Sequence, residues 1–262
     1  MRLYGPTNVL SNGNFETGST GPWYTYTTSG SINLAVTTAS PYAGAYTLVA
    51  SVVAHQENVR YPYAAQRLIN NVFYADRRYA CRFNGKSSVA RSFVVGVDSV
   101  SPVENTVSLS TSYEPLEALF APTIDVTSTF LRFSCGVGSD TLLYLDNIEI
   151  RGYAQLAPEW DYERMTIRNR TDDRTRAGAL YTTLNPGGFT RFRLPLSWVS
   201  SLDRSIVTSW WKSGAELLYA ENDAYPFSYH SVRIMGLEEP FQTSMAPHYQ
   251  AYYAGEIILE TV

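Results

Sequence analysis

Short segments that alternate between polar and apolar residues recur through the first 150 residues. In residues 79–83, Tyr79, Cys81 and Phe83 share one face of the pattern and polar or small residues share the other. A period of two residues is typical of a half-buried β-strand. Residues 31–36 alternate in the same way, and no segment in this half has the 3.6-residue period of a helix. The pattern therefore predicts an all-β first domain.

Residues 130–137 and 142–150 are two further strand-like segments. They are separated by Gly138-Ser-Asp140, which has the composition of a tight turn. Two such segments joined by a short turn are the usual signal of a β-hairpin. The sequence therefore predicts that these two strands pair with each other.

A domain boundary is expected near residue 153. Residues 152–159 contain glycine and proline and interrupt the strand pattern, so we place domain 1 at residues 1–153 and domain 2 at 154–262. Strands are also expected in domain 2, which we predict to be a β-rich sandwich or barrel. The strand candidates there are residues 188–194, 229–234 and 255–261.

One helix is expected in domain 2, at about residues 202–212. Ser200 or Ser201 can act as its N-cap, Asp203 lies in the positively polarised first turn, and Gly214 can take the left-handed position after the last turn. Lys212 complements the last turn. An apolar stripe at helical spacing would face the core: Ile206, Val207, Trp210 and Trp211.

Composition narrows the class of protein. The chain has 262 residues, is 45% hydrophobic and 17% charged, contains 20 Tyr, and carries a net charge of −4. An acidic chain without a basic cluster does not fit nucleic-acid binding. No apolar run approaches the roughly 18 residues of a membrane span, so no membrane insertion is expected. The N-terminus has no signal-peptide pattern, so synthesis in the cytoplasm is expected. Cys81 and Cys135 lie in apolar strand segments, which favours buried free thiols over a disulfide.

The first domain resembles carbohydrate-binding modules with a galactose-binding-like jelly-roll fold. The resemblance covers residues 8–151 and is carried by five segments in the family's order. They are Asn8 to Gly18 with its Asn-Gly-Asn-Phe-Glu core, Trp23, Ser40 to Leu48, Ala65-Gln-Arg-Leu, and Leu142 to Ile150 with its Asp-Asn pair. The family position of Trp23 packs in the core. The resemblance implies a β-sandwich whose first and last strands are neighbours.

The resemblance also implies a structural Ca²⁺, because related modules tie the opening strand to the closing strand through a hard cation. Glu16 and Asp146 are the matching carboxylates. Since Ca²⁺ takes six to eight oxygens, backbone carbonyls near residues 42–44 would have to complete the site. Asn14 stands where many relatives have Asp, which lowers the charge of the site. The alternative is that both carboxylates only accept hydrogen bonds from backbone amides.

A sugar-binding cleft is the second feature that the family implies. Sugars present apolar CH faces and hydroxyl edges, so their binding sites combine flat aromatic rings with polar side chains. The candidates are Tyr61 and Tyr63 as an aromatic platform, with Tyr113, Arg82 and Asn84 as further contacts. Many modules of this family have lost sugar binding and act as packing domains.

Patterns of catalytic chemistry are weak. Ser209 and Lys212 have the spacing of some serine acylases, but a helix surface explains them better. His55, His230 and His248 are far apart in the sequence and lack metal-ligand spacing. Asp172 and its neighbours form an alternating charge run that is most simply a solvated edge. We therefore predict a protein that is not an enzyme.

The leading hypothesis is a bacteriophage virion structural protein, such as a tail, tail-tip or head-decoration subunit. It would display domain 1 toward cell-surface glycans and contact other virion proteins and copies of itself, so the expected location is the virion. Domain 2 contains Arg-Ala-Gly-Ala-Leu-Tyr at residues 176–181, Phe-Arg-Leu-Pro-Leu at 192–196 and Ser-Trp-Trp-Lys-Ser-Gly at 209–214. In these segments it loosely resembles C-terminal β-domains of phage virion proteins. Its candidate interface residues are Trp198, Trp210, Trp211, Tyr252 and Tyr253. A free carbohydrate-binding protein or adhesin is the alternative, and a glycosidase or acyl hydrolase is a third.

Overall fold

In a computed structural model the chain forms two compact units. The sandwich unit is Thr7–Gly152, and the helix unit combines Met1–Pro6 with Tyr153–Val262. The structure describes residues 1–26, 31–53, 63–75, 77–97, 103–135, 141–158, 163–167, 170–174, 180–184, 189–221, 229–236, 238–241, 243–244 and 252–262.

The first six residues belong to a different unit from the one predicted. Strand β1 (Arg2–Tyr4) pairs with residues 153–155 at the end of strand β11 (Thr141–Gln155) and with strand β16 (Leu217–Ala220). The first six residues therefore fold with the helix unit rather than with the rest of residues 1–153. Pairing across more than 150 residues of sequence leaves no local signal, which is why the sequence pattern did not reveal it.

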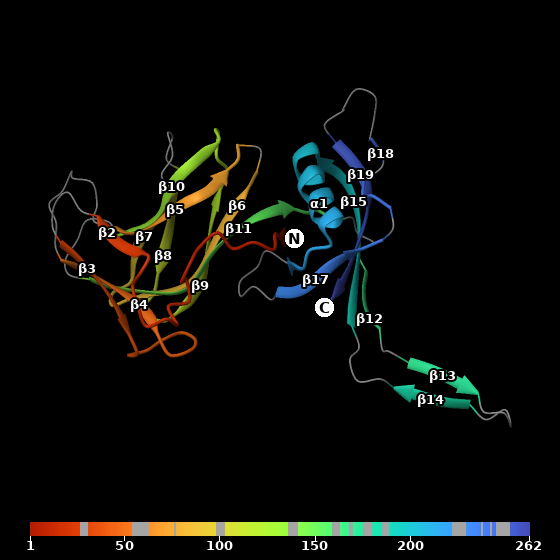
Figure 1. The fold of residues 1–262 in the computed structure, drawn as a ribbon, viewed down its shortest axis with the longest axis horizontal. Coiled ribbons are helices and arrows are strands. Elements are labelled where there is room, and N and C mark those ends of the chain that lie inside the picture. Colours follow the sequence, from red (N-terminus) through yellow and green to blue (C-terminus); the bar gives the residue numbers. More distant parts are fainter. Residues whose placement is uncertain are drawn as a thin grey trace. The chain divides into compact units, whose positions relative to one another are not determined.

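Two antiparallel five-stranded sheets make up the sandwich unit (Figure 1). The first sheet has the order β2 (Trp23–Tyr26), β5 (Tyr63–Phe73), β10 (Val126–Cys135), β7 (Arg91–Val97), β8 (Val103–Leu109). The second sheet has the order β3 (Ser31–Thr37), β4 (Thr47–Val53), β11, β6 (Tyr79–Ser87), β9 (Glu114–Phe120).

The chain crosses from one sheet to the other at most of its connections, as in a jelly-roll. The predicted hairpin of residues 130–137 and 142–150 is wrong for this reason. Strand β10 pairs with β5 and β7, whereas β11 pairs with β4 and β6 in the other sheet. A turn signal between two strands does not distinguish a hairpin from a crossover, because both reverse the chain.

The core of the sandwich unit lies between the two sheets. Phe133 of β10 is fully buried, and its ring centroid is 5.1 Å from that of Phe83 in β6 and 6.0 Å from that of Trp23 in β2. Trp23 is 4% exposed, so its predicted place in the core is confirmed. Cys81 is also in this core and is a free thiol, while the side chain of Cys135 lies outside the described residues. Burial raises the pKa of Cys81 well above its usual value, and the negative charges of Glu149 and Glu117 add to this effect.

The opening segment of the sandwich unit runs beside the closing strand, as the family resemblance implied. The amide of Val9 donates to the carbonyl of Ile150 at 3.1 Å, and the amide of Ile148 donates to the carbonyl of Gly13 at 2.9 Å. A Cβ at position 13 would overlap the carbonyl oxygen of Ile148, so only glycine permits this approach. The segment carries Glu16 toward the strand that carries Asp146.

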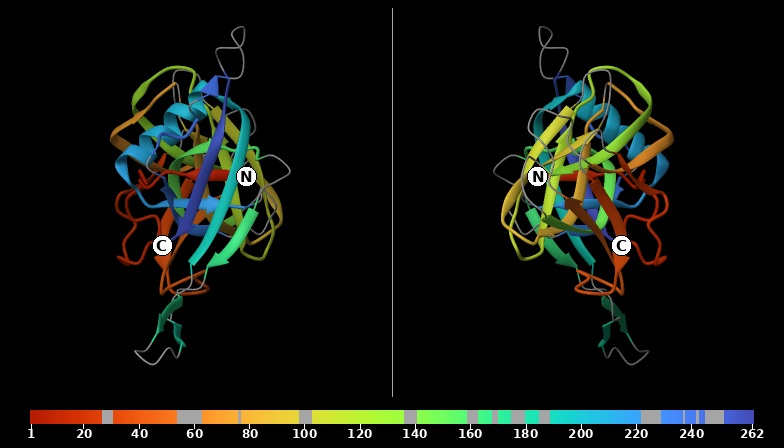
Figure 2. Two further views of the ribbon diagram at one scale, coloured as in Figure 1. Left: turned by 90° about the vertical axis from the view of Figure 1, so that its right-hand side faces the viewer. Right: turned by 90° about the vertical axis from the view of Figure 1, so that its left-hand side faces the viewer.

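The described residues of the helix unit form a larger antiparallel sheet, which one helix covers, and a separate two-stranded sheet of residues 170–174 and 180–184. Helix α1 (Ser201–Ser213) contacts strands β15, β17 and β19, and their apolar side chains share one core (Figures 1 and 2). The remaining strands are β12 (Glu163–Ile167), β13 (Arg170–Arg174), β14 (Leu180–Leu184), β15 (Phe189–Ser200), β17 (Tyr229–Met235), β18 (Thr243–Ser244) and β19 (Tyr252–Thr261).

Helix α1 has the caps that the sequence predicts. The hydroxyl of Ser200 accepts a hydrogen bond from the amide of Asp203, and Gly214 ends the helix in the left-handed conformation with φ of 61°. Asp203 is buried and accepts a second hydrogen bond from the amide of Gln155 at 3.1 Å, which ties the helix to the end of β11. Among the described residues, no helix is both long and apolar enough to cross a membrane.

Candidate functional site

The outer face of the first sheet of the sandwich unit presents aromatic and charged side chains together. Along β10, Leu131 and Phe133 point into the core, so Phe130 and Arg132 point outward. The strand register places one outward row across all five strands of the sheet. It consists of Tyr24, Ala65, Arg132, Gly96 and Glu104, with Arg67 and Phe130 paired in the adjacent outward row. We call these residues the first-sheet face.

Aromatic rings occupy one end of the first-sheet face. The rings of Tyr24 and Phe130 meet edge to face at a centroid distance of 6.0 Å and an interplanar angle of 78°. The guanidinium carbon of Arg67 lies 5.9 Å from the centroid of the Phe130 ring, on an exposed side chain. Flat rings beside a guanidinium can contact the CH face of a sugar and donate hydrogen bonds to its hydroxyls.

An ion pair occupies the other end of the face. Arg132 of β10 pairs with Glu104 of β8, and its side chain crosses the intervening strand β7 at Gly96. A Cβ at position 96 would lie 3.0 Å from Nε of Arg132, so glycine keeps this path open. The side chain of Glu104 is 46% exposed, which leaves its carboxylate available to a ligand.

A buried hydroxyl lies on the same side of the sheet. Ser134 follows the inward Phe133 in β10, is 1% exposed, and its Oγ has no hydrogen-bond partner among the described residues. A buried hydroxyl without a partner costs about 1–3 kcal/mol. A polar ligand group that reached this hydroxyl would remove that cost.

The predicted aromatic platform is only partly described. The backbone of Tyr63 pairs with Tyr26 and Ser134 in the first sheet, but its side chain lies outside the described residues, and all of Tyr61 does. Sequence reasoning missed Tyr24, Phe130 and Arg132. The signal that could have found them is the alternation of Phe130-Leu-Arg-Phe133, which separates an outward Phe and Arg from the inward Leu and Phe.

Of the other predicted sugar contacts, Arg82 and Asn84 lie in β6 of the second sheet and Tyr113 directly precedes β9. Two of these three side chains interact with other residues of the unit. Arg82 forms an ion pair with Glu149 at 3.0 Å. The hydroxyl of Tyr113 donates to the carbonyl of Ser40 at 3.0 Å and lies 3.0 Å from the hydroxyl of Thr47. Burial raises the pKa of Tyr113, although the hydrogen bond with Thr47 lowers it. Asn84 has a buried Oδ1 without a hydrogen-bond partner among the described residues.

An aromatic cluster surrounds Tyr113, which directly precedes β9. The ring of Tyr42, which is 48% exposed, meets the Tyr113 ring edge to face at 5.6 Å. The ammonium of Lys86 lies 4.5 Å from the Tyr113 centroid and 4.9 Å from that of Tyr144. These side chains form a surface cluster in which each ring or ammonium group contacts another member of the cluster.

The two predicted metal carboxylates converge on the 42–46 loop. Asp146 is fully buried and accepts hydrogen bonds from the amides of Tyr42, Ala43 and Asn147. Glu16 accepts hydrogen bonds from the amides of Ala45 and Tyr46. Burial raises the pKa of Asp146. Its three amide hydrogen bonds lower the pKa, and the negative charge of Glu16 adds to the rise.

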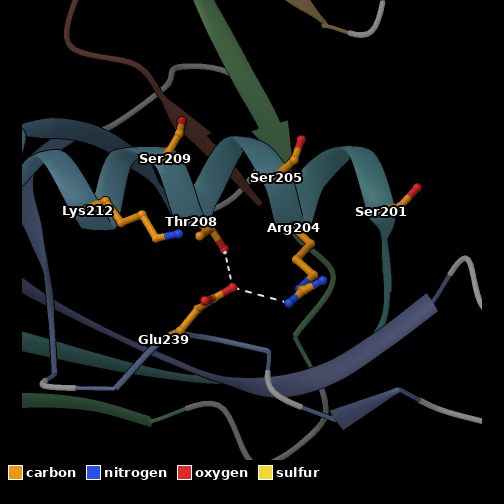
Figure 3. Close-up of a pocket in the computed structure, with 7 residues that line it drawn as sticks. All are labelled: Ser201, Arg204, Ser205, Thr208, Ser209, Lys212 and Glu239. Atoms are coloured by element: carbon orange, nitrogen blue, oxygen red, sulfur yellow. Dashed lines mark hydrogen bonds and ion pairs between the residues drawn. The ribbon is translucent and has the colours of Figure 1, made fainter.

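The Ser209 and Lys212 pair does not form a nucleophile–base arrangement. Its residues line a pocket of about 330 Å³ along α1, but Oγ of Ser209 donates to the carbonyl of Ile206 at 2.7 Å (Figure 3). Lys212 points to the other flank of the helix, toward Glu239 (Figure 3). Glu239 accepts hydrogen bonds from Arg204 and Thr208. The pocket is therefore a polar contact between α1 and the segment that carries Glu239.

The aromatic residues predicted for assembly have different environments. Trp198 is 60% exposed, has a φ of 62°, and contacts the ring of Tyr252 at 5.9 Å, beside a register shift in β15. Trp210 packs on the core of the helix unit, and Nε1 of Trp211 donates to the carbonyl of Gly236. The Tyr253 ring lies 4.3 Å from the guanidinium carbon of Arg204. Only Trp198 and Tyr252 of this set are exposed.

No three His, Cys, Asp or Glu side chains gather in a metal-binding group within the described ranges. No protein-family profile matches the sequence, and a search of curated proteins finds no match.

Solved structures with a similar fold include several carbohydrate-binding modules. The xylan-binding CBM22-1 domain of Xyn10C from Paenibacillus barcinonensis aligns with a TM-score of 0.45 and 17% identity, over 56% of this chain and 96% of that domain. The arabinose-bound α-L-arabinofuranosidase MgGH51 gives 0.48 and 14%, over 57% of this chain and 27% of the enzyme. Tailspike protein 4 of bacteriophage CBA120 gives 0.43 and 13%, over 55% and 21%. The likeness to these structures concerns the fold alone.

Proposed function

We propose that the sandwich unit binds carbohydrate on the first-sheet face. The carrying observation is that Tyr24, Phe130 and Arg67 stand on the same outward side of one sheet as the Arg132–Glu104 ion pair. A sugar ring would stack on the aromatic end while its hydroxyls reach the guanidinium and carboxylate groups. The resemblance of residues 8–151 to carbohydrate-binding modules supports the same function.

Binding by the full-length chain to a glycan array, followed by calorimetry on the strongest glycan, tests this proposal. Truncation of a buried aromatic contact costs more than about 1 kcal/mol, so we expect Phe130→Ala and Tyr24→Ala each to weaken binding roughly five- to tenfold or more. Arg132→Ala should also weaken binding. A Tyr61→Ala/Tyr63→Ala double variant asks whether these two tyrosines contribute to the same ligand.

The matched control is Tyr42→Ala, which removes an exposed tyrosine from the 42–46 loop of the same unit. Its affinity should equal that of the wild type. Circular dichroism on each variant separates loss of binding from loss of fold. Absence of binding to every glycan, or an equal loss in Tyr42→Ala, would refute the placement of the site.

A second candidate function is supported by the helix unit. We infer that the chain is a structural subunit of a phage particle, in which the helix unit contacts other subunits and the sandwich unit faces glycans. The exposed pair Trp198 and Tyr252 favours this function, because large exposed aromatic residues are enriched at protein interfaces. Sedimentation of the purified chain with and without Trp198→Ala tests it, since a monomer at every concentration for both proteins would contradict self-assembly.

The structure offers less support for an enzyme. The one acylase-like spacing in the sequence, Ser209 and Lys212, points its two side chains to different flanks of α1 (Figure 3). We therefore propose binding without catalysis. A glycan that is bound and then recovered intact after long incubation is the expected result, and its cleavage would contradict this proposal.

A further inference from the structure

The 42–46 loop lies between two carboxylates from distant parts of the chain. Asp146 accepts hydrogen bonds from the amides of Tyr42 at 3.1 Å and Ala43 at 3.3 Å. Glu16 accepts the amide of Ala45 at 3.1 Å on both of its oxygens and the amide of Tyr46 at 3.2 Å. Four of the five amides of the loop therefore point at carboxylate oxygens.

The direction of these amides decides which ligands the loop can offer to a cation. In a trans peptide the N–H and the preceding C=O point in opposite directions, and the peptides of this loop are trans. The carbonyls that precede the four amides belong to Pro41, Tyr42, Gly44 and Ala45. These carbonyls therefore face away from Glu16 and Asp146. A Ca²⁺ ion between the two carboxylates would meet N–H groups where it needs oxygen ligands.

Gly44 allows the loop to take this form. Its φ is +67°, and a Cβ there would overlap the carboxylate group of Glu16. The glycine lets the Glu16 carboxylate lie against the loop backbone, so that the amides of residues 45 and 46 reach it. Successive backbone amides in such a turn form a concave site for an anion.

We propose that Glu16 and Asp146 stabilise the sandwich unit by accepting hydrogen bonds from backbone amides, without a metal ion. We call this cation-independent arrangement the latch. The positive ends of the amide dipoles take the place of the cation in holding the opening segment, the 42–46 loop and strand β11 together. Asn147 adds its own amide to Asp146 at 2.8 Å. The residues present do not fit the calcium site that the family resemblance implied.

Thermal unfolding of the full chain in excess EDTA and in millimolar CaCl₂ tests the latch. We expect the same midpoint in both solutions. Glu16→Gln should lower the midpoint by the same amount with and without calcium, because it weakens the bonds to the loop amides. Asp146→Asn should do likewise, and Glu16→Gln keeps the test usable if Asp146→Asn fails to fold.

Asp125→Asn is the matched control, because Asp125 accepts one backbone amide elsewhere in the same unit, from Ala75 at 2.8 Å. The unfolding midpoint of Asp125→Asn should be the same in EDTA and in CaCl₂, as for the wild type. A midpoint that falls in EDTA and recovers with CaCl₂, or one calcium per chain measured by mass spectrometry after dialysis, would overturn the proposal. Loss of that calcium response in Glu16→Gln alone would assign the metal to these carboxylates.

Discussion

Two glycines of the sandwich unit allow the contribution of Glu16 to the latch to be measured. Gly44 and Gly18 both have φ of +67°, so an alanine at either position meets the same backbone penalty. At Gly18 the nearest atoms to an added Cβ belong to the ring of Tyr46 at 3.4 Å, an ordinary contact. At Gly44 the added Cβ would displace the Glu16 carboxylate. The two substitutions differ mainly in that displacement.

The expected difference follows from the hydrogen bonds that Glu16 would lose. The left-handed conformation costs an alanine about 1–2 kcal/mol at either position. Glu16 lies on the exposed surface, so each of its bonds to the amides of Ala45 and Tyr46 contributes about 0.5–1.5 kcal/mol. Gly44→Ala should therefore destabilise the unit by about 1–3 kcal/mol more than Gly18→Ala. For a unit of this size that is roughly 2–10 °C in the unfolding midpoint.

Urea unfolding followed by circular dichroism measures both variants, and a double-mutant cycle isolates the cause. In a Glu16→Ala background the extra cost of Gly44→Ala should disappear, because no carboxylate remains to be displaced. Equal costs for the two glycine variants would refute the reasoning. An excess cost that persists in the Glu16→Ala background would also refute it, because the penalty would then come from the loop itself.

Three further predictions concern buried groups of the sandwich unit. Phe133→Ala should cost about 3–5 kcal/mol of unfolding free energy in urea, and the outward-facing Phe130→Ala clearly less; equal costs would contradict the burial. In a Cys135→Ser background, Cys81 should react with a thiol reagent only after unfolding, because its pKa is raised by burial; fast native labelling would contradict this. Burial raises the pKa of Asp146 above 3.8, so the folded chain holds this proton more tightly than the unfolded chain. The unfolding free energy of the wild type relative to Asp146→Asn should be highest below pH 3.8 and fall as pH rises through the raised pKa; the opposite slope would contradict the shift.

The sequence pattern correctly predicted the features that depend on a single strand or helix. The alternation in residues 79–83 predicted β6, and the caps at Ser200 and Gly214 predicted the ends of α1 to within one residue. These features depend on side chains a few residues apart, so the sequence carries them directly. The core position of Trp23 came from the family resemblance.

The pairing between strands could not be predicted from the sequence pattern in the same way. The segments 130–137 and 142–150 were predicted to pair with each other, yet β10 and β11 belong to different sheets. Both strands have an inward apolar face, and this is equally consistent with one sheet or two facing sheets. The first-sheet face was not predicted for the same reason, because its side chains come from four separate strands: Tyr24, Arg67, Phe130, Arg132 and Glu104.

The sequence by itself determined that this chain is rich in strands, where its helix begins and ends, and which two carboxylates bracket the first domain. It did not determine what these carboxylates hold. That depended on the direction of the amides in the 42–46 loop, which is set by backbone conformation around Gly44 and by the approach of residues 16 and 146 from opposite ends of the unit. Peptide orientation is a property of the folded backbone, so only the tertiary structure could decide between carbonyl ligands for a cation and amide donors for an anion.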